Sequence, residues 1–336
     1  MHSVRSGTGR PLVLVPGIGA DSGTWQFVLP GLSAEREVIA LDLPGFGRTP
    51  MLQGEVTFAR YADALADHLR AEGLERADLV GSSMGARLVM ELARRGLGGA
   101  TVALDPGGFW TPGQVAVFNA SLTASVALVR RIRPALPALL ATPVGRTALL
   151  AQLSARPWAL PREFALSEVR GLADFPGTSP AIRLLAKGPV QEGAPAGTLP
   201  GRMTVGWGRQ DRVTLPSQAL RAQELFPDAR VVMIDGCGHF AIFWRIVIPL
   251  SVPALATTAI FTFIWTWNDF FSQLIFLTDP DMYTVPVALR TFVDATSQTP
   301  WGPVFAMSIV ALAPVFGFFL AGQRYLVRGI ATTGLK

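Results

Sequence analysis

The sequence predicts an α/β fold with a mostly parallel sheet, followed by two membrane-spanning helices. Short apolar runs closed by glycine or proline recur through the first 240 residues, with helix-period stretches between them. One run leads into a Gly-x-Ser-x-Gly pentapeptide, which is typical of a sharp strand-to-helix turn. Beyond residue 240 charge becomes sparse, because only five of the 29 Lys+Arg and four of the 24 Asp+Glu lie there.

Six apolar runs are predicted to form the buried strands of the sheet. They alternate with helical stretches such as Phe58–Leu69 and Leu88–Gly96, and this alternation favours parallel strands with helices on both faces. In chain order the runs are Pro11–Pro16, Val38–Asp42, Asp78–Gly81, Ala100–Asp105, a run around Val205, and Val231–Asp235.

The alternation stops between residues 109 and 196, and this segment is predicted to be a helical cap over the carboxyl edge of the sheet. It is rich in Ala, Leu, Pro and Arg, with helical pieces at Val117–Ile132, Leu139–Leu153 and Ser179–Lys187. The expected domains are therefore core residues 1–108, cap 109–196, core 197–240 and a membrane segment 241–336.

Ser83, in Gly81-Ser82-Ser83-Met84-Gly85, is the candidate nucleophile. A strand must turn sharply into a helix to expose this hydroxyl at the sheet edge, and small residues two before and two after relieve the crowding. A serine hydroxyl also needs a base to accept its proton. Of three histidines, His2 is at the terminus and His68 is expected to be solvated, so His239, after the last predicted strand, is the candidate base.

The base in turn needs a carboxylate that orients it. Asp211 follows the penultimate strand and is the first candidate, while Asp105 ends an earlier strand and is the alternative. The tetrahedral oxyanion requires backbone N–H donors. The glycine turn after the first strong strand and the residue after the nucleophile suggest the amides of Ile18 and Met84.

Taken together, these motifs closely resemble the α/β-hydrolase superfamily, in its small esterase-like branch. The resemblance covers residues 1–240 and includes Leu14–Gly19, Asp42–Thr49, the pentapeptide, Gly208-x-x-Asp211 and Gly236-x-Gly238-His239-Phe240. It implies a serine hydrolase acting on ester bonds of a small-molecule acyl substrate, with no cofactor and no metal. One departure is Pro16, which stands where the family usually has histidine. Another departure follows the catalytic histidine. The family continues there into an amphipathic helix that packs on the sheet, and in this chain an apolar segment takes its place.

The residues after His239 resemble the end of a maltose-type carbohydrate ABC-transporter permease. The likeness begins in Phe243–Leu255, continues through Trp267–Phe271 and ends in Gln323–Ile330. It covers only the last two spanning helices of that family. In the permeases a cytoplasmic loop before these helices docks on the ATPase, but here the first half of that loop is replaced by the last predicted strand of the hydrolase, so ATPase docking is doubtful. Residues Asp235–Phe240 fit both the hydrolase motif and the permease motif, which suggests that a chimeric junction lies there.

The membrane segment is expected to span an inner membrane twice. Val304–Gly322 carries no charge, and at ~1.5 Å per residue it spans ~28 Å. Positive residues precede the first span and follow the second, which places the hydrolase in the cytoplasm. Membrane lipid is thus an expected partner. Nucleic acid is not, despite a sequence pI of 10.1, because the arginines are scattered and the densest group, Arg130–Arg133, suits a solvated helix face.

Two hypotheses of function follow. The first is a serine hydrolase anchored by a permease fragment. The second is a permease fragment in a chimeric or misassembled gene product that has no transport activity of its own. In the first, Ala241–Ile248 is expected to pack as a short helix that keeps the base near Ser83.

Overall fold

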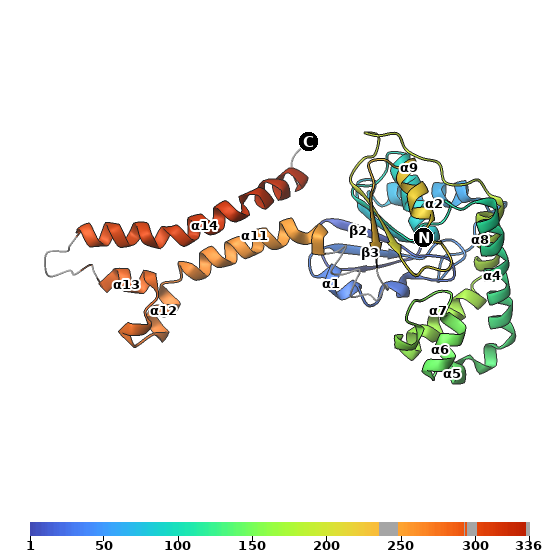
Figure 1. The fold of residues 1–336 in the computed structure, drawn as a ribbon, viewed down its shortest axis with the longest axis horizontal. Coiled ribbons are helices and arrows are strands. Elements are labelled where there is room, and N and C mark those ends of the chain that lie inside the picture. Colours follow the sequence, from blue (N-terminus) through green and yellow to red (C-terminus); the bar gives the residue numbers. More distant parts are fainter. Residues whose placement is uncertain (235–247, 292, 294–300, 334–336) are drawn as a thin grey trace. The chain divides into compact units, whose positions relative to one another are not determined.

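The computed structural model describes residues 1–234, 248–291, 293 and 301–333 (Figure 1). The chain divides into two compact units, residues 1–245 and 246–336. The first is named the hydrolase unit after the family that its sequence resembles, and the second is named the C-terminal unit. The junction hexapeptide Asp235–Phe240, with the candidate base His239, and the expected short helix Ala241–Ile248 (but for its last residue) lie outside the described residues.

The hydrolase unit is built on a seven-stranded sheet in the order β1-β3-β2-β4-β5-β6-β7. All six strands expected from the sequence are present and pair in parallel. A seventh, β1, was not expected and pairs antiparallel with β3 at one edge. The strands are β1 (Ser3–Ser6), β2 (Pro11–Val15), β3 (Glu37–Leu41), β4 (Asp78–Ser82), β5 (Thr101–Leu104), β6 (Met203–Gly208) and β7 (Arg230–Ile234).

Helices cover the sheet and supply most of its apolar core. The larger core cluster joins β2 and β3 to helices α2 (Phe58–Ala71) and α3 (Met84–Arg94). A second cluster joins β5 and β6 to the other side of α3 and to α9 (Gln218–Leu225). This unit also contains the short helix α1 (Leu29–Ser33) and the 3₁₀ turns η1 (Ser22–Trp25), η2 (Arg133–Ala135) and η3 (Pro157–Ala159).

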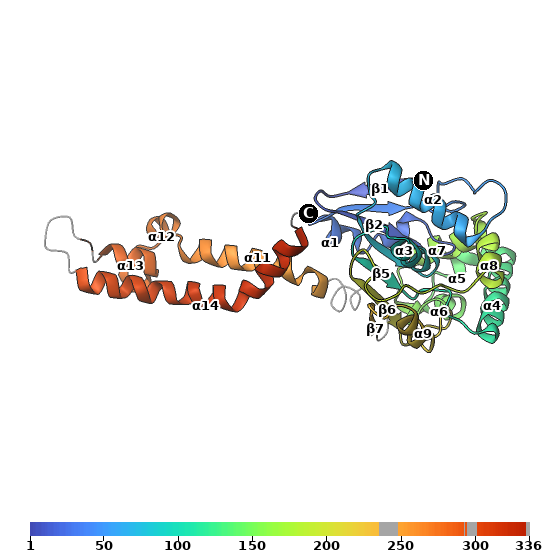
Figure 2. The ribbon, with the colours of Figure 1, turned by 90° about the horizontal axis from the view of Figure 1, so that it is seen from above.

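The cap consists of five helices inserted between β5 and β6, gathered beyond one side of the sheet (Figures 1 and 2). The expected piece Leu139–Leu153 is divided between two helices, because Thr142 accepts a hydrogen bond from the Gly145 N–H and starts a new helix. One cap helix, α7, was not expected from the sequence. The helices are α4 (Pro112–Arg131), α5 (Leu136–Leu139), α6 (Pro143–Leu150), α7 (Arg162–Asp174) and α8 (Thr178–Lys187).

Two long helices form the C-terminal unit and lie side by side in both ribbon views (Figures 1 and 2). The indole N–H of Trp267 on α11 donates to the Ala311 carbonyl of α14 at 3.1 Å, and the rings of Phe263 and Phe318 stack at 4.5 Å. α11 ends at Trp267, so Asn268 and Asp269 follow this helix rather than interrupt it. The elements are α11 (Ile248–Trp267), α12 (Phe271–Phe276), η5 (Pro280–Met282), α13 (Val285–Thr291) and α14 (Trp301–Thr333).

Within the described residues, two helices are long and apolar enough to cross a membrane, and they differ in burial. One is Trp301–Leu320 of α14, none of which is buried. The other is the cap helix Pro112–Arg131, whose Phe118, Leu122 and Val126 pack into the hydrolase core. Of the first expected span, Thr258–Trp267 qualifies as a shorter apolar helix. The C-terminal unit thus contains one candidate span by this criterion.

Candidate active site

Ser83 occupies the sharp turn that the pentapeptide predicts. Its backbone has φ 53° and ψ −114°, a conformation that a residue with a Cβ rarely adopts and that costs roughly 1–3 kcal/mol. The Ser83 N–H donates to the Leu104 carbonyl at 2.9 Å, which ties the turn to the end of β5. The side chain stands half-buried between β4 and α3. Such a strained serine at the carboxyl end of a central strand is the geometry of a nucleophile elbow.

The two glycines of the pentapeptide are required by close backbone contacts. A Cβ on Gly81 would collide with the Gly85 carbonyl, and a Cβ on Gly85 would collide with the Val15 carbonyl of β2. Both obstacles are backbone atoms, which cannot move aside as a flexible side chain can. The small residues therefore let β4, α3 and β2 meet behind the Ser83 hydroxyl.

The predicted oxyanion donors lie beside this turn. Met84 is the first residue of α3, so its N–H has no partner within the helix and lies at the positive end of the helix dipole. Across from it, a Cβ on Gly17 would stand 3.1 Å from the Ser83 Cβ and 3.8 Å from its Oγ. The turn containing Gly17 and the half-buried Ile18 thus borders the Ser83 hydroxyl. The two amides come from the two segments that flank the hydroxyl, as an oxyanion site needs.

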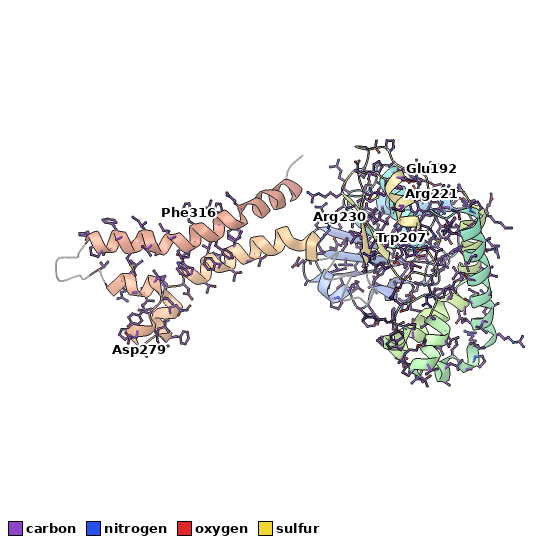
Figure 3. All side chains as sticks on the ribbon, viewed as in Figure 1. Glu192, Trp207, Arg221, Arg230, Asp279 and Phe316 are labelled. Atoms are coloured by element: carbon purple, nitrogen blue, oxygen red, sulfur yellow. The ribbon has the colours of Figure 1, made fainter. Side chains whose placement is uncertain are left out.

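Asp211 lies in a loop after β6 and its carboxylate is held by three donors. Oδ1 accepts the N–H groups of Val213 at 2.6 Å and Thr214 at 2.9 Å, and Oδ2 accepts the Thr214 hydroxyl at 2.8 Å. This loop is itself fixed, because the buried Trp207 of β6 donates its indole N–H to the Thr214 carbonyl at 2.8 Å (Figure 3). Oδ2 keeps a lone pair for one further donor, so the carboxylate is oriented but not saturated.

The alternative acid, Asp105, lies directly beside Asp211. It follows β5 with φ 49°, and its Oδ1 accepts the Gly208 N–H at 2.6 Å. Burial, and then the neighbouring Asp211 carboxylate, raise the pKa of Asp105 to about 7. Burial and a neighbouring carboxylate both disfavour the charged form of a carboxyl group. Three N–H and O–H donors orient the Asp211 carboxylate, whereas Asp105 accepts the Gly208 N–H.

Two of the three histidines, His2 and His68, lie within the described residues, and neither forms a hydrogen bond with Ser83 or Asp211 in that part of the chain. His2 is not a loose terminus, since its Nδ1 contacts the Asp42 carboxylate at 2.9 Å and its N–H donates to Thr49. His68 was expected to be solvated, and that expectation is wrong. It is half-buried on α2, its Nε2 is buried without a partner in the described structure, and burial lowers its pKa.

The cap rests on the turn that contains Gly17, Ile18 and Gly19 through α7, a contact that the sequence did not reveal. A Cβ on Gly19 would stand 2.8 Å from the Leu172 Cα, so the glycine allows the helix to approach the turn. Glu168 of the same helix accepts the Thr24 hydroxyl at 3.3 Å, and burial raises its pKa to about 7. A carboxyl of this kind could have been suspected only if α7 had been placed on the turn.

No group of three or more potential metal-ligating side chains was found among the described residues. The expected absence of a cofactor is a separate matter that the structure does not test. The described part of the site offers a strained hydroxyl after β4, two candidate amide donors beside it, and an oriented carboxylate after β6, two strands away.

Residues 12–245 match the sequence model of the Alpha/beta hydrolase family, a range that covers most of the chain. The chain belongs to the alpha/beta hydrolase family. Solved structures agree on the fold of this hydrolase. A thermophilic esterase from Thermogutta terrifontis has a TM-score of 0.54 at 22% identity, covering 79% of this chain and 93% of its own. The enol-lactonase from Burkholderia xenovorans LB400 has a TM-score of 0.56 at 18% identity, covering 73% and 91%.

The C-terminal part of the chain matches a family of permease domains. Residues 229–332 match the family described as Binding-protein-dependent transport system inner membrane component. The probable ABC transporter permease protein YurM of Bacillus subtilis is 44% identical over 103 residues, which is 31% of this chain and 34% of that protein. The trehalose/maltose transport system permease protein MalG of Thermococcus litoralis is 38% identical over 104 residues, 31% of this chain and 37% of that protein.

The chain therefore spans about a third of the length of these permeases. The two family matches also overlap, because one ends at residue 245 and the other begins at residue 229. Both recognised resemblances are thus confirmed, and the permease domain suggests an inner-membrane location.

Proposed function

We propose that the chain is a serine esterase in which Ser83 attacks the acyl carbon, His239 accepts the serine proton and Asp211 orients the imidazole. The observation that carries this proposal is the strained Ser83 turn with the amide of Met84 beside it. Asp211 is preferred to Asp105 as the orienting group because three donors hold it as an anion. The amides of Ile18 and Met84 stabilise the oxyanion.

The chain length from β7 is sufficient to bring His239 to Ser83. Strand β7 lies three positions from β4 in the sheet, a separation of about 14 Å at ~4.8 Å per strand. Four residues lie between Ile234 and His239, so five Cα–Cα steps join them, and five extended steps span up to roughly 17 Å. The imidazole can therefore reach the Ser83 side of the sheet edge without any change in β7.

The reaction proceeds by acyl transfer. The Ser83 oxygen adds to the carbonyl carbon as its proton passes to His239, and the amides of Ile18 and Met84 receive the negative oxygen. His239 then gives the proton to the leaving alcohol as the ester C–O bond breaks, which leaves the acyl group on the Ser83 oxygen. Water attacks this acyl carbon while His239 takes its proton, and His239 passes that proton to the Ser83 oxygen as the acid is released. Asp211 holds the imidazole in the tautomer that can accept the proton and stabilises its charged form.

The C-terminal unit is proposed to anchor this enzyme in the inner membrane. Two membrane passes by α11 and α14, with the hydrolase unit in the cytoplasm, agree with the apolar, unburied Trp301–Leu320 and with Arg324 and Arg328 after it. The matched region is about a third of the length of the permeases that it resembles, and no transport activity is proposed for it. The overlap of the two family matches at residues 229–245 supports a chimeric origin.

Turnover of a p-nitrophenyl ester by the full chain in detergent tests the catalytic proposal. The wild-type chain is expected to hydrolyse a short-chain ester, and Ser83→Ala is expected to reduce kcat by roughly 10⁵–10⁶-fold. Ser82→Ala is the matched control, because this neighbouring hydroxyl ends β4 and has no assigned role. Equal loss in both variants, or turnover that does not depend on Ser83, contradicts the proposal.

A further inference from the structure

The outer end of the cap carries an apolar groove that no other described part of the chain fills. It is open, has a volume of ≈ 460 Å³, and is lined by Pro143, Val144, Thr147, Ala148 and Trp158. Val144 is 78% exposed and Trp158 is 52% exposed. Large apolar side chains at this exposure, gathered in one place, mark a surface that contacts something other than water.

The groove belongs to a well-packed region. Beneath it, Leu136, Leu140 and Leu150 are almost fully buried in a cluster of their own. The Arg146 guanidinium connects the end of α5 to η3, since it donates to the Leu140 carbonyl at 2.9 Å and to the Trp158 carbonyl at 3.0 Å. Val144 and Trp158 are therefore held outward by a preformed scaffold.

This part of the cap carries a net positive charge. Residues 112–162 contain six arginines and no Asp or Glu, whereas the whole chain has a net charge of +5. Arg156 is exposed immediately before η3. Arg162 is exposed at the start of α7, where it reaches the Pro137 carbonyl and lies 3.8 Å from the Glu163 carboxylate. Exposed arginines around an apolar surface with tryptophan are the combination that binds the interface of an anionic bilayer.

We propose that the α5–α6–η3 face of the cap docks on the surface of an anionic lipid bilayer, with Val144 and Trp158 entering the interface and Arg156 and Arg162 contacting lipid phosphates. A bilayer is favoured over a protein partner because exposed aliphatic and indole groups in the groove are flanked by residues of net positive charge. The same chain carries the unburied apolar segment Trp301–Leu320, which gives it an independent reason to be at a membrane.

Quenching of a label by brominated lipid tests this docking in the full chain. The labelled variants carry Cys237→Ser and one new cysteine with an environment-sensitive fluorophore, at Val144 or at the control position Leu220. Leu220 on α9 is matched in exposure, at 74%. The Val144 label is expected to be quenched in vesicles that contain phosphatidylglycerol and much less in phosphatidylcholine vesicles. The Leu220 label is expected to be quenched in neither.

Removing the arginines should weaken docking by a defined factor. A basic residue near an anionic surface contributes about fivefold to the docked population, so Arg156→Gln with Arg162→Gln is expected to lower the docked-to-undocked ratio about 25-fold. Salt at 1 M should act in the same direction, because it shortens the Debye length to about 3 Å.

Three results would overturn the proposal. They are no quenching at Val144 above that at Leu220, equal quenching in both lipids, and a protected Val144 label that crosslinks to a second cap. A label at Phe316 on α14 (Figure 3) separately reports whether the C-terminal unit enters the bilayer. The Val144 comparison is valid in either case, because it sets one label against two lipid compositions. None of these measurements depends on hydrolysis, so failure of the Ser83 proposal is distinguishable.

Discussion

The hydrolase unit and the C-terminal unit place their large apolar side chains in opposite environments. In the hydrolase unit, Trp207 and Phe226 are 0% exposed beneath helices and strands. In the C-terminal unit, Phe316 is 61% exposed and Phe276 is 80% exposed. The first unit satisfies the hydrophobic effect within itself, while the second needs lipid or further helices. One chain is thus built for two solvents, and the proposed catalytic base belongs to the segment that joins them.

The first comparison tests whether Asp211, in the hydrolase unit, takes part in catalysis. Asp211→Asn should lower kcat for a p-nitrophenyl ester by about 10⁴-fold, because the amide favours the wrong imidazole tautomer. Asp105→Asn is the matched control and should retain most of the activity. Its amide oxygen can still accept the Gly208 N–H. The reverse pattern would make Asp105 the orienting acid.

The next comparison removes one phenylalanine from each unit. Phe226→Ala should lower the free energy of unfolding of the hydrolase unit by about 3–5 kcal/mol, because it leaves a cavity in the core. Phe316→Ala, on the exposed surface of α14, should leave that value unchanged. Urea denaturation followed by circular dichroism of both variants measures the difference. If both variants lowered the free energy of unfolding equally, the contrast between the buried core of the hydrolase unit and the exposed apolar surface of α14 would be wrong.

A buried charge in the membrane should oppose insertion of α14. Val310 is 64% exposed near the middle of Trp301–Leu320, and Val310→Asp is expected to cost about 3 kcal/mol of insertion free energy. Leu220→Asp, at a comparably exposed site of the hydrolase unit, should cost nothing. Extraction of cell membranes with alkaline carbonate reports insertion. If Val310→Asp stays in the membrane fraction as fully as the wild-type chain, α14 does not span it.

The last comparison is a pH dependence within the acid pair. The pKa of Asp105 is raised to about 7, so the folded state holds a proton that the unfolded state loses near pH 4. Wild-type stability therefore decreases as pH rises from about 4 to about 7 through this group, and then levels. Asp105→Asn removes the titrating group, so its thermal stability relative to wild type should increase over that window. A difference that is constant with pH would contradict the raised pKa.

Strand positions were largely predictable because local pattern determines them. The turn at Ser83 and the runs before Asp105 and Asp211 could be recognised from glycine spacing and apolar runs alone. The short β1 could not, since Ser3–Ser6 gains its strand character only by pairing with β3. Helix α7 was not predicted, because polar residues between its apolar positions obscure the apolar face that packs against the Gly19 turn.

The candidate site was only partly predictable. The types of residue were apparent, but the contact between Asp105 and Asp211 arises from the adjacency of β5 and β6. Likewise, the role of Trp207 in holding the Asp211 loop depends on a hydrogen bond to Thr214, seven residues away. The position of His239 remains a prediction, with chain length from Ile234 as its support.

The proposal that Ser83 is activated by a base from the junction is tested most directly by a fluorophosphonate probe with mass spectrometry of the full chain. The predicted result is one adduct on the Ser83 oxygen, formed rapidly in the wild-type chain and at least a hundredfold more slowly in His239→Ala, as expected for loss of a general base. An unlabelled Ser83, or a labelling rate that His239→Ala does not change, would contradict the account.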